Sequence, residues 1–203
     1  MEIQKFKNGN KELKIIQDED PESPREWDNL GIMFCFHKKY NLGDKNNLNS
    51  DNFGSWNEIE ENLIKEEKAI LIKPLFLYDH SGISIKIGSF NGLVPGGHAK
   101  FDSGQVGFIY TTKEKIKECY GIKKVTKNIL NKAEECLKGE IETYDQYLRG
   151  DNYGFELIEI TKCKECGEIK ENIIDSCWGF YGSDINTNGI KEHIDIKGFK
   201  EVV

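Results

Sequence analysis

The feature that most constrains the fold is a long amphipathic segment from about Lys127 to Leu148. Apolar side chains recur in it at spacings of three and four residues, at Leu130, Ala133, Leu137, Ile141, Tyr144 and Leu148. This periodicity predicts a helix with one apolar face. Because such a helix must bury that face against another element, we expect it to pack on a sheet.

Strand patterns occur in pairs on both sides of this helix. "AILIKPLFLYDHSGISIKIGSF" (69–90) predicts a hairpin that turns at "DHSG", with Pro74 at an edge or a bulge because proline cannot donate to a strand ladder. "QVGFIYTT" (105–112) predicts a strand, and 153–161 and 173–182 predict two more, joined by a turn. We therefore expect one α+β domain over residues 1–203, in which an antiparallel sheet built from hairpins carries two or three helices.

Capping patterns predict two shorter helices. Ser55 precedes Glu58 by three residues, which is a capping-box spacing, and Ile59 and Leu63 then fall on one helical face. Thr111 and Glu114 repeat the pattern before a helix that Gly121 would end. The segment 90–104, "FNGLVPGGHAKFDSG", predicts a long glycine-rich connection.

Charge and hydropathy argue against two classes of protein, those that coat duplex DNA and those that span a membrane. The formal net charge is −7, which argues against a protein that coats duplex DNA with a basic face. The apolar runs are too short to span a bilayer, and the first residues lack the apolar core of a signal peptide, so a cytoplasmic protein without membrane contact is expected. Six cysteines in a cytosolic chain are expected to be reduced thiols.

Four residues form the candidate metal set. Cys163 and Cys166 in "CKEC" have the spacing of one zinc knuckle, and Cys177 and His193 are the nearest residues that could complete four ligands. The cysteine pair supplies only two of the four ligands that structural zinc needs. A reduced, exposed pair without a cofactor is therefore favoured, and zinc binding is the alternative. Strand alternation places Trp178 and Phe180 on a buried face and Cys177 on the other beside Asp175, so a nucleophilic role for Cys177 is not favoured.

The polar motifs do not assign catalytic residues. Asp79, His80 and Ser81 are consecutive in a turn, where a relayed triad is not expected. "VPGGHAK" (94–100) lacks the Ser or Thr that follows the lysine of a phosphate-binding loop. Asp79, His80 and Asp102 are nevertheless candidate binding residues, because "DHSG", "FDSGQ" and "YDQYLRGDNYG" would form a polar pocket if they converged.

The ordered set "WDNLG", "LYDHSGI", "FDSGQVGFIY", "YDQYLRGDNYGFE" and "DSCWGFYG" resembles a family of uncharacterised small proteins encoded by bacteriophages and other bacterial mobile elements. The resemblance covers roughly residues 20–185. It implies a viral setting inside a bacterial host cell and no particular activity.

In that setting an acidic chain without a recognisable active site favours a binding protein rather than an enzyme. The leading hypothesis is an inhibitor of a host defence system, of the anti-CRISPR kind, that binds a host protein whose basic surface normally meets nucleic acid. The acidic candidates for that surface are Asp18, Glu19, Asp20, Glu58 and Glu61. The alternative is an enzyme or binding protein for nucleotides or nucleic acid that uses the polar pocket.

Overall fold

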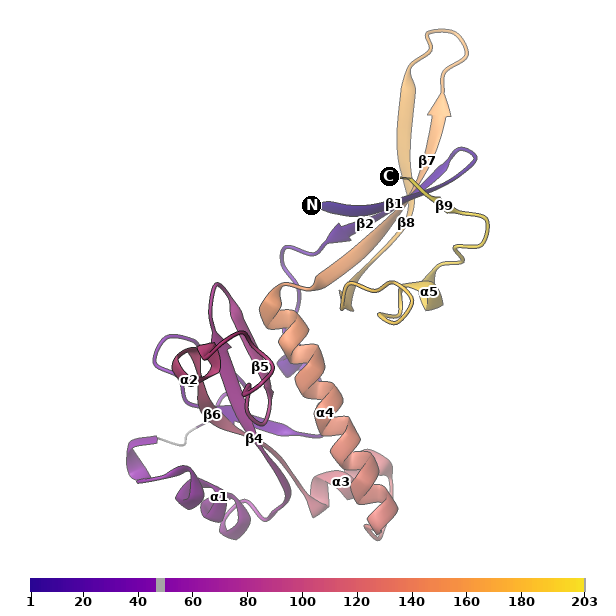
Figure 1. Ribbon diagram of the computed structural model, residues 1–203. Helices are drawn as coiled ribbons and strands as arrows, with labels where there is room; N and C mark the ends of the chain where they lie inside the picture. The colour runs from indigo at the N-terminus through magenta and orange to yellow at the C-terminus, as the bar shows by residue number, and fades with distance from the viewer. Residues whose placement is uncertain (47–49, 203) are drawn as a thin grey trace. The chain divides into compact units, whose positions relative to one another are not determined.

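The computed structural model describes residues 1–46 and 50–202, and the chain divides into two compact units. Unit 1 is formed by Met1–Glu22 together with Gly150–Val203, and unit 2 by Ser23–Arg149. Figure 1 labels their helices and strands. Each unit has its own sheet and its own hydrophobic core, and the expectation of one domain over residues 1–203 stays a prediction.

Unit 1 is a five-stranded antiparallel sheet in the order β8-β7-β2-β1-β9. Its elements are β1 (Glu2–Asn8), β2 (Lys11–Gln17), β7 (Asn152–Lys162), β8 (Ile169–Tyr181), the short helix α5 (Ile190–His193) and β9 (Lys200–Glu201). Leu13, Ile15 and Phe155 form its buried face together with Ile190 of α5. The first strand pair was not expected from the sequence, although its turn at Asn8, Gly9 and Asn10 is a hairpin signal.

The faces of β8 differ from the expected alternation. The pairing with β7 shifts register between Tyr153 and Phe155, which pair with Phe180 and Cys177, and Gly179 has a φ of 86°. A bulge of this kind inserts an extra residue and reverses the alternation beyond it. Phe180 therefore packs in the core on the same side as Cys177, and the prediction that Trp178 shares the buried face of Phe180 was wrong.

Unit 2 has a four-stranded antiparallel sheet in the order β3-β6-β4-β5. Its strands are β3 (Ile32–Cys35), β4 (Ala69–Asp79), β5 (Ile83–Ile87) and β6 (Ser103–Thr112). Its helices are α1 (Trp56–Lys65), α2 (His98–Asp102), α3 (Lys113–Tyr120) and α4 (Lys127–Arg149), with the short 3-10 turns Pro24–Glu26 and Ser50–Asn52. The predicted α+β class, with antiparallel hairpins and helices packed on a sheet, is confirmed.

Helices cover both faces of the unit 2 sheet. Ala133, Leu137 and Ile141 of α4 are buried against Met33, Leu75, Leu77, Ile85 and Ile109. Ile59 and Leu63 of α1 are buried against Phe34, Phe108 and Tyr110, whose side chains point the other way. Successive side chains of β3 and β6 thus point alternately toward α4 and toward α1, and they contribute to the core on each face of the sheet. The prediction that the long helix packs its apolar face on a sheet is confirmed.

The capping signals predicted the start of α1 and misplaced the cap of α3 by one residue. Ser55 Oγ accepts the backbone N–H of Glu58, as the capping spacing required. The cap of α3 is Thr112, which accepts the N–H of Lys115, and not Thr111, which is fully buried. Pro74 lies in an inner strand next to a register shift between Leu75 and Phe76.

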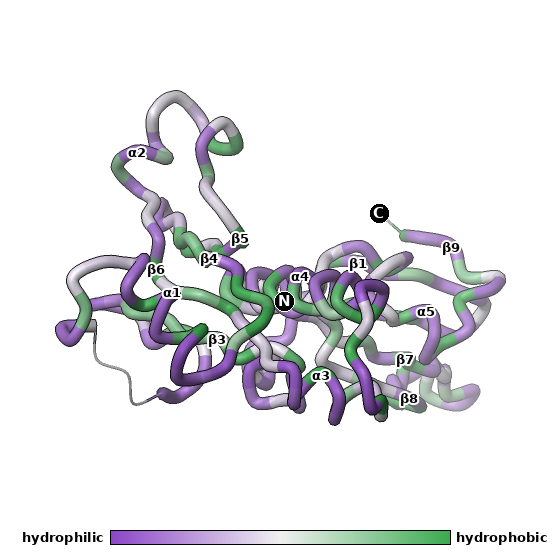
Figure 2. Tube along the Cα trace, turned by 90° about the horizontal axis from the view of Figure 1, so that it is seen from below, coloured by the Kyte–Doolittle hydropathy of each residue, from purple (hydrophilic) through white to green (hydrophobic). Residues whose placement is uncertain are grey.

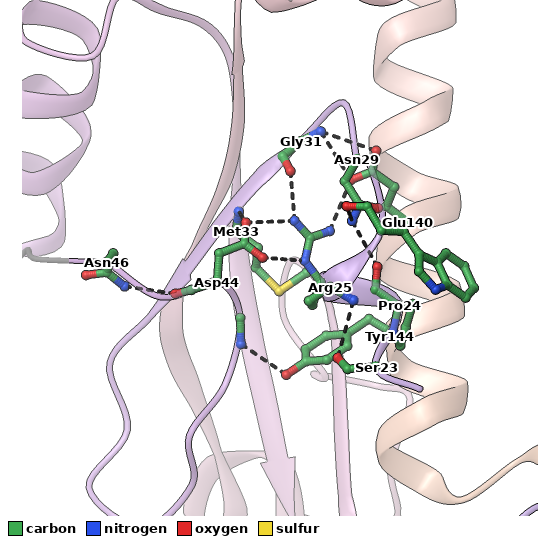
Figure 3. A network of polar contacts seen from close by, with 12 residues as sticks. Ser23, Pro24, Arg25, Asn29, Gly31, Met33, Asp44, Asn46, Glu140 and Tyr144 are labelled. Carbon is green, nitrogen blue, oxygen red and sulfur yellow. Dashed lines mark hydrogen bonds and ion pairs between the residues drawn. The ribbon is translucent and has the colours of Figure 1, made fainter. Parts of the chain in front are cut away.

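A buried ionic cluster fastens the first segment of unit 2 to α4 (Figure 3). Arg25 donates to both carboxylate oxygens of Asp44 at 2.8 Å and to Glu140 at 3.1 Å. The guanidinium also donates to the carbonyl of Gly31 at 2.7 Å, and its side chain is only 5% exposed. Burial tends to lower the pKa of Arg25, but the two carboxylates outweigh it and raise that pKa. Arg25 is therefore an anchor and not part of a solvated acidic face.

No helix in the described part of the chain combines the length and the apolar character needed to cross a bilayer.

Candidate functional site

Two histidines and one aspartate of unit 2 meet where β4 ends and β6 begins. His80 lies in the turn between β4 and β5, while His98 and Asp102 are one helical turn apart on α2. His80 Nδ1 is 3.0 Å from Asp102 Oδ2, and His98 Nδ1 is 3.6 Å from the same oxygen. One ligand atom from each side chain lies within 4.8 Å of the other two. We call these three residues the His–Asp site.

Strand pairing explains why these residues meet. Tyr78 pairs with Ser103 across β4 and β6, so the residues that follow Tyr78 and precede Ser103 emerge at the same edge of the sheet. The turn is closed by a bond from the N–H of His80 to the carbonyl of Gly82, whose φ is 146°. Figure 2 shows the connection that leads into α2 as mostly pale or hydrophilic chain with a short hydrophobic stretch.

The geometry fits a divalent metal ion. Metal–nitrogen and metal–oxygen bonds of about 2.0–2.2 Å place neighbouring ligand atoms roughly 3.0–3.6 Å apart, which matches both contacts of Asp102. Two histidines and one carboxylate are a ligand set of zinc and of non-haem iron sites that keep open positions. The side chains of His80, His98 and Asp102 are 46%, 40% and 31% exposed, so a ligand can approach from solvent.

A purely structural role explains only part of this arrangement. A hydrogen bond between His80 and Asp102 would by itself tie the turn to α2. His98 Nδ1, however, is buried and makes no hydrogen bond, although it points at the Asp102 carboxylate. A buried ring nitrogen without a hydrogen bond has given up its interaction with water, and a bond to a metal ion at this position would replace that interaction.

The His–Asp site adjoins a cavity of 490 Å³. Asp79 and Asp102 line it together with Phe101, His37 and Lys38. The hydroxyl of Tyr40 donates to Asp79 at 3.1 Å, and the Lys39 ammonium lies 3.5 Å from the same carboxylate. These contacts raise the pKa of Lys39, first through Tyr40 and then through Asp79, so the ammonium keeps its charge.

The aromatic ring of Phe101 is presented to solvent beside the site. Its side chain is 82% exposed, which is unusual for a phenylalanine, and the Lys100 ammonium lies 5.8 Å from its ring centroid. An exposed ring is a platform on which a nucleobase can stack. The cavity therefore combines a candidate metal ligand, Asp102, with the Lys38 ammonium and a stacking surface.

A second cavity, of 660 Å³, borders the Arg25 cluster. Arg25 already directs four hydrogen bonds to Asp44, Glu140 and Gly31, and a guanidinium has five N–H groups. Glu140 in turn accepts the backbone N–H groups of Leu30 and Gly31. Four of the five N–H groups of this guanidinium have internal partners, and we assign the cluster to folding.

The candidate binding residues fall into separate groups. Asp79, His80 and Asp102 do converge, whereas the third motif of the pocket hypothesis, residues 144–154, does not line this cavity. Glu58 and Glu61 lie on α1, where Glu58 accepts the N–H of Gly54 and Glu61 pairs with Lys65 at 3.0 Å. The remaining acidic candidates, Asp18, Glu19 and Asp20, belong to unit 1.

Cys163, Cys166, Cys177 and His193, the alternative four-ligand zinc set, do not come together in the described part of the chain. Cys163 and Cys166 lie in the turn after Lys162, whereas Cys177 pairs with Phe155, seven residues back along β7. At about 3.3 Å per residue, that distance is far beyond the reach of a shared ion. His193 packs against the ring of Phe180 at 5.2 Å. Among the described residues, the His–Asp site is the group of three or more ligands close enough for a metal.

Sequence reasoning missed His98. The signal was present, because His98 and Asp102 have the i, i+4 spacing that places two side chains on one helical face. The glycines before them led to the prediction of an open connection rather than a short helix. No protein-family model, curated protein or solved structure matches the chain.

Proposed function

We propose that the protein binds a divalent transition-metal ion at His80, His98 and Asp102 and uses it to hold the phosphate groups of a nucleotide or nucleic-acid strand. The convergence of these three side chains, with His98 Nδ1 buried and without a hydrogen bond, is the observation that supports the proposal most directly. The open side of the site leaves coordination positions for phosphate oxygens.

The surrounding side chains suit the same ligand. Lys38 and His37 line the cavity and can face phosphate oxygens that the ion does not bind. Phe101 offers a stacking surface for the base. A metal ion at this position would also lower the pKa of a bound water, which is the first requirement for phosphoester hydrolysis.

Calorimetric titration with Zn²⁺ and Mn²⁺, followed by a fluorescent nucleotide or a short single-stranded oligonucleotide, tests the proposal. All measurements use a Cys163→Ser and Cys166→Ser background, which removes the exposed thiols that could bind the ion themselves. In that background His80→Ala, His98→Ala and Asp102→Asn are expected to lose metal binding and, with it, metal-dependent nucleotide binding. His193→Gln, an exposed histidine of unit 1, is the matched control and should behave as wild type. Equal metal affinity in wild type and all three variants would overturn the proposal. Product analysis of the same mixtures reports any hydrolysis.

The inhibitor hypothesis stays a proposal with its own support. Glu58, Glu60, Glu61, Glu66 and Glu67 are all exposed on α1 and the residues directly after it, and they outnumber Lys65 and Lys68. An acidic helix of this kind can steer association with a basic surface of a host protein. The resemblance to phage-encoded proteins supports that setting, and the two proposals use different surfaces of unit 2.

A further inference from the structure

The turn between β7 and β8 carries a pair of thiols at the end of a projecting hairpin (Figure 1). Pairing between β2 and β7 ends at Glu159, whereas pairing between β7 and β8 continues to Lys162 and Ile169. The end of the hairpin therefore extends beyond the neighbouring strand. Cys163 and Cys166 occupy this end, and Cys166 is exposed.

The backbone of the turn is arranged around the Cys163 sulfur. The N–H of Gly167 donates to the carbonyl of Cys163 at 3.0 Å, and the N–H of Cys163 donates to the carbonyl of Glu168 at 2.8 Å. Gly167 has a φ of 75°, which allows the chain to turn back immediately after Cys166. Backbone N–H groups of Cys166 and Glu165, and the Cys166 thiol, donate to the Cys163 sulfur and lower its pKa.

This is the arrangement of half a tetrahedral thiolate site. Cys163 and Cys166 have the Cys-x-x-Cys spacing of a zinc knuckle and lie in one tight turn, so both sulfurs can bind one ion. A structural zinc ion needs four ligands. Within the described residues no third His, Cys, Asp or Glu completes the pair.

We propose that the β7–β8 turn is one half of a zinc site that the same turn of a second copy of this chain completes, giving a Zn²⁺ ion bound by four cysteine sulfurs. Binding replaces the thiol protons with the metal and releases them to solvent, without oxidation. The site is separate from the His–Asp site and does not depend on the proposed function.

The surroundings of the turn favour a second copy as the partner. Residues 162–171 contain Lys162, Lys164, Lys170, Glu165, Glu168 and Glu171, so equal numbers of positive and negative charges meet when two identical turns approach. Ile169, Ile173 and Ile174 are 64%, 58% and 46% exposed along the adjoining strand. A second hairpin placed beside the first would cover some of this apolar surface.

Native mass spectrometry of the full chain with Zn²⁺ under reducing conditions tests the proposal, in the His98→Ala background so that the His–Asp site does not contribute. We expect a dimer that carries one zinc ion and dissociates with a chelator. Co²⁺ in place of zinc should give the intense visible absorption of tetrahedral thiolate coordination. Cys163→Ser and Cys166→Ser should each remain monomeric, whereas Cys119→Ser, a change of an exposed cysteine elsewhere, should dimerise normally.

A monomer with one bound zinc, a chain that binds no zinc, or an intramolecular Cys163–Cys166 disulfide that persists in reductant would each overturn the proposal. Unchanged circular dichroism of the two turn variants shows that lost dimerisation does not come from lost folding.

Discussion

Replacing Arg25 by methionine should destabilise unit 2 by about 3 kcal/mol, the lower end of the range for removing one partner of a buried ion pair. The change removes four hydrogen bonds and leaves Asp44 and Glu140 without their cation. The value lies at the lower end because both carboxylates keep backbone donors. Asp44 still accepts the N–H of Met33, and Glu140 those of Leu30 and Gly31.

Urea denaturation followed by circular dichroism measures this loss. With an m-value of about 2 kcal/mol per M, the midpoint should fall by roughly 1.5 M. Lys65→Met, which removes the exposed partner of Glu61, is the control and should change the free energy of unfolding by less than about 0.5 kcal/mol. In a Glu140→Gln background, Arg25→Met should lower the free energy of unfolding by a smaller amount, because the residue at position 140 is then uncharged and only Asp44 is left without its cation. A loss of less than about 1 kcal/mol in the free energy of unfolding would refute the assignment of a buried ion-pair cluster.

Three further predictions address the core, the thiols and the acidic helix. Leu137→Asp places an unpaired carboxylate in a position with no exposed surface, so it should cost several kcal/mol and abolish the cooperative melt; an unchanged melt would contradict the packing of α4. Because the pKa of Cys163 is lowered, its thiolate persists to lower pH, and its alkylation rate should be half-maximal below the ordinary thiol value of about 8.5. A midpoint at or above that value would be evidence against the N–H···S contacts. Charge reversal at Glu58 and Glu61 should slow association with a basic host partner and weaken its salt dependence, whereas the triple lysine variant of residues 18–20 tests the acidic group of unit 1; equal rates and salt slopes in all variants would remove the inhibitor hypothesis.

Local signals were predictable from the sequence because neighbouring residues determine them. The Ser55 cap, the turn at 79–82 and the apolar stripe of α4 each depend on a few consecutive side chains. The N-terminal strands were harder, because β2 gains its partner β7 from about 140 residues further along the chain. That pairing also explains why residues 1–22 and 150–203 belong to one compact unit.

The site was only partly predictable for the same reason. Asp79, His80 and Asp102 were identified as candidates, but the pairing of Tyr78 with Ser103 is what brings them together. His98 was missed because its role depends on a short helix that propensity alone does not indicate after two glycines. The face of Trp178 was assigned wrongly because a strict period-two pattern assumes that the strand has no bulge, whereas β8 has one near Gly179.

X-ray absorption spectroscopy at the zinc edge tests the central claim most directly, on the full chain carrying Cys163→Ser and Cys166→Ser and loaded with one equivalent of Zn²⁺. The account predicts two imidazole ligands and oxygen ligands at about 2.0–2.1 Å, with the imidazole signal reduced in His80→Ala or His98→Ala. A spectrum with oxygen ligands alone, or one that both histidine substitutions leave unchanged, would contradict the assignment of a metal ion to His80, His98 and Asp102.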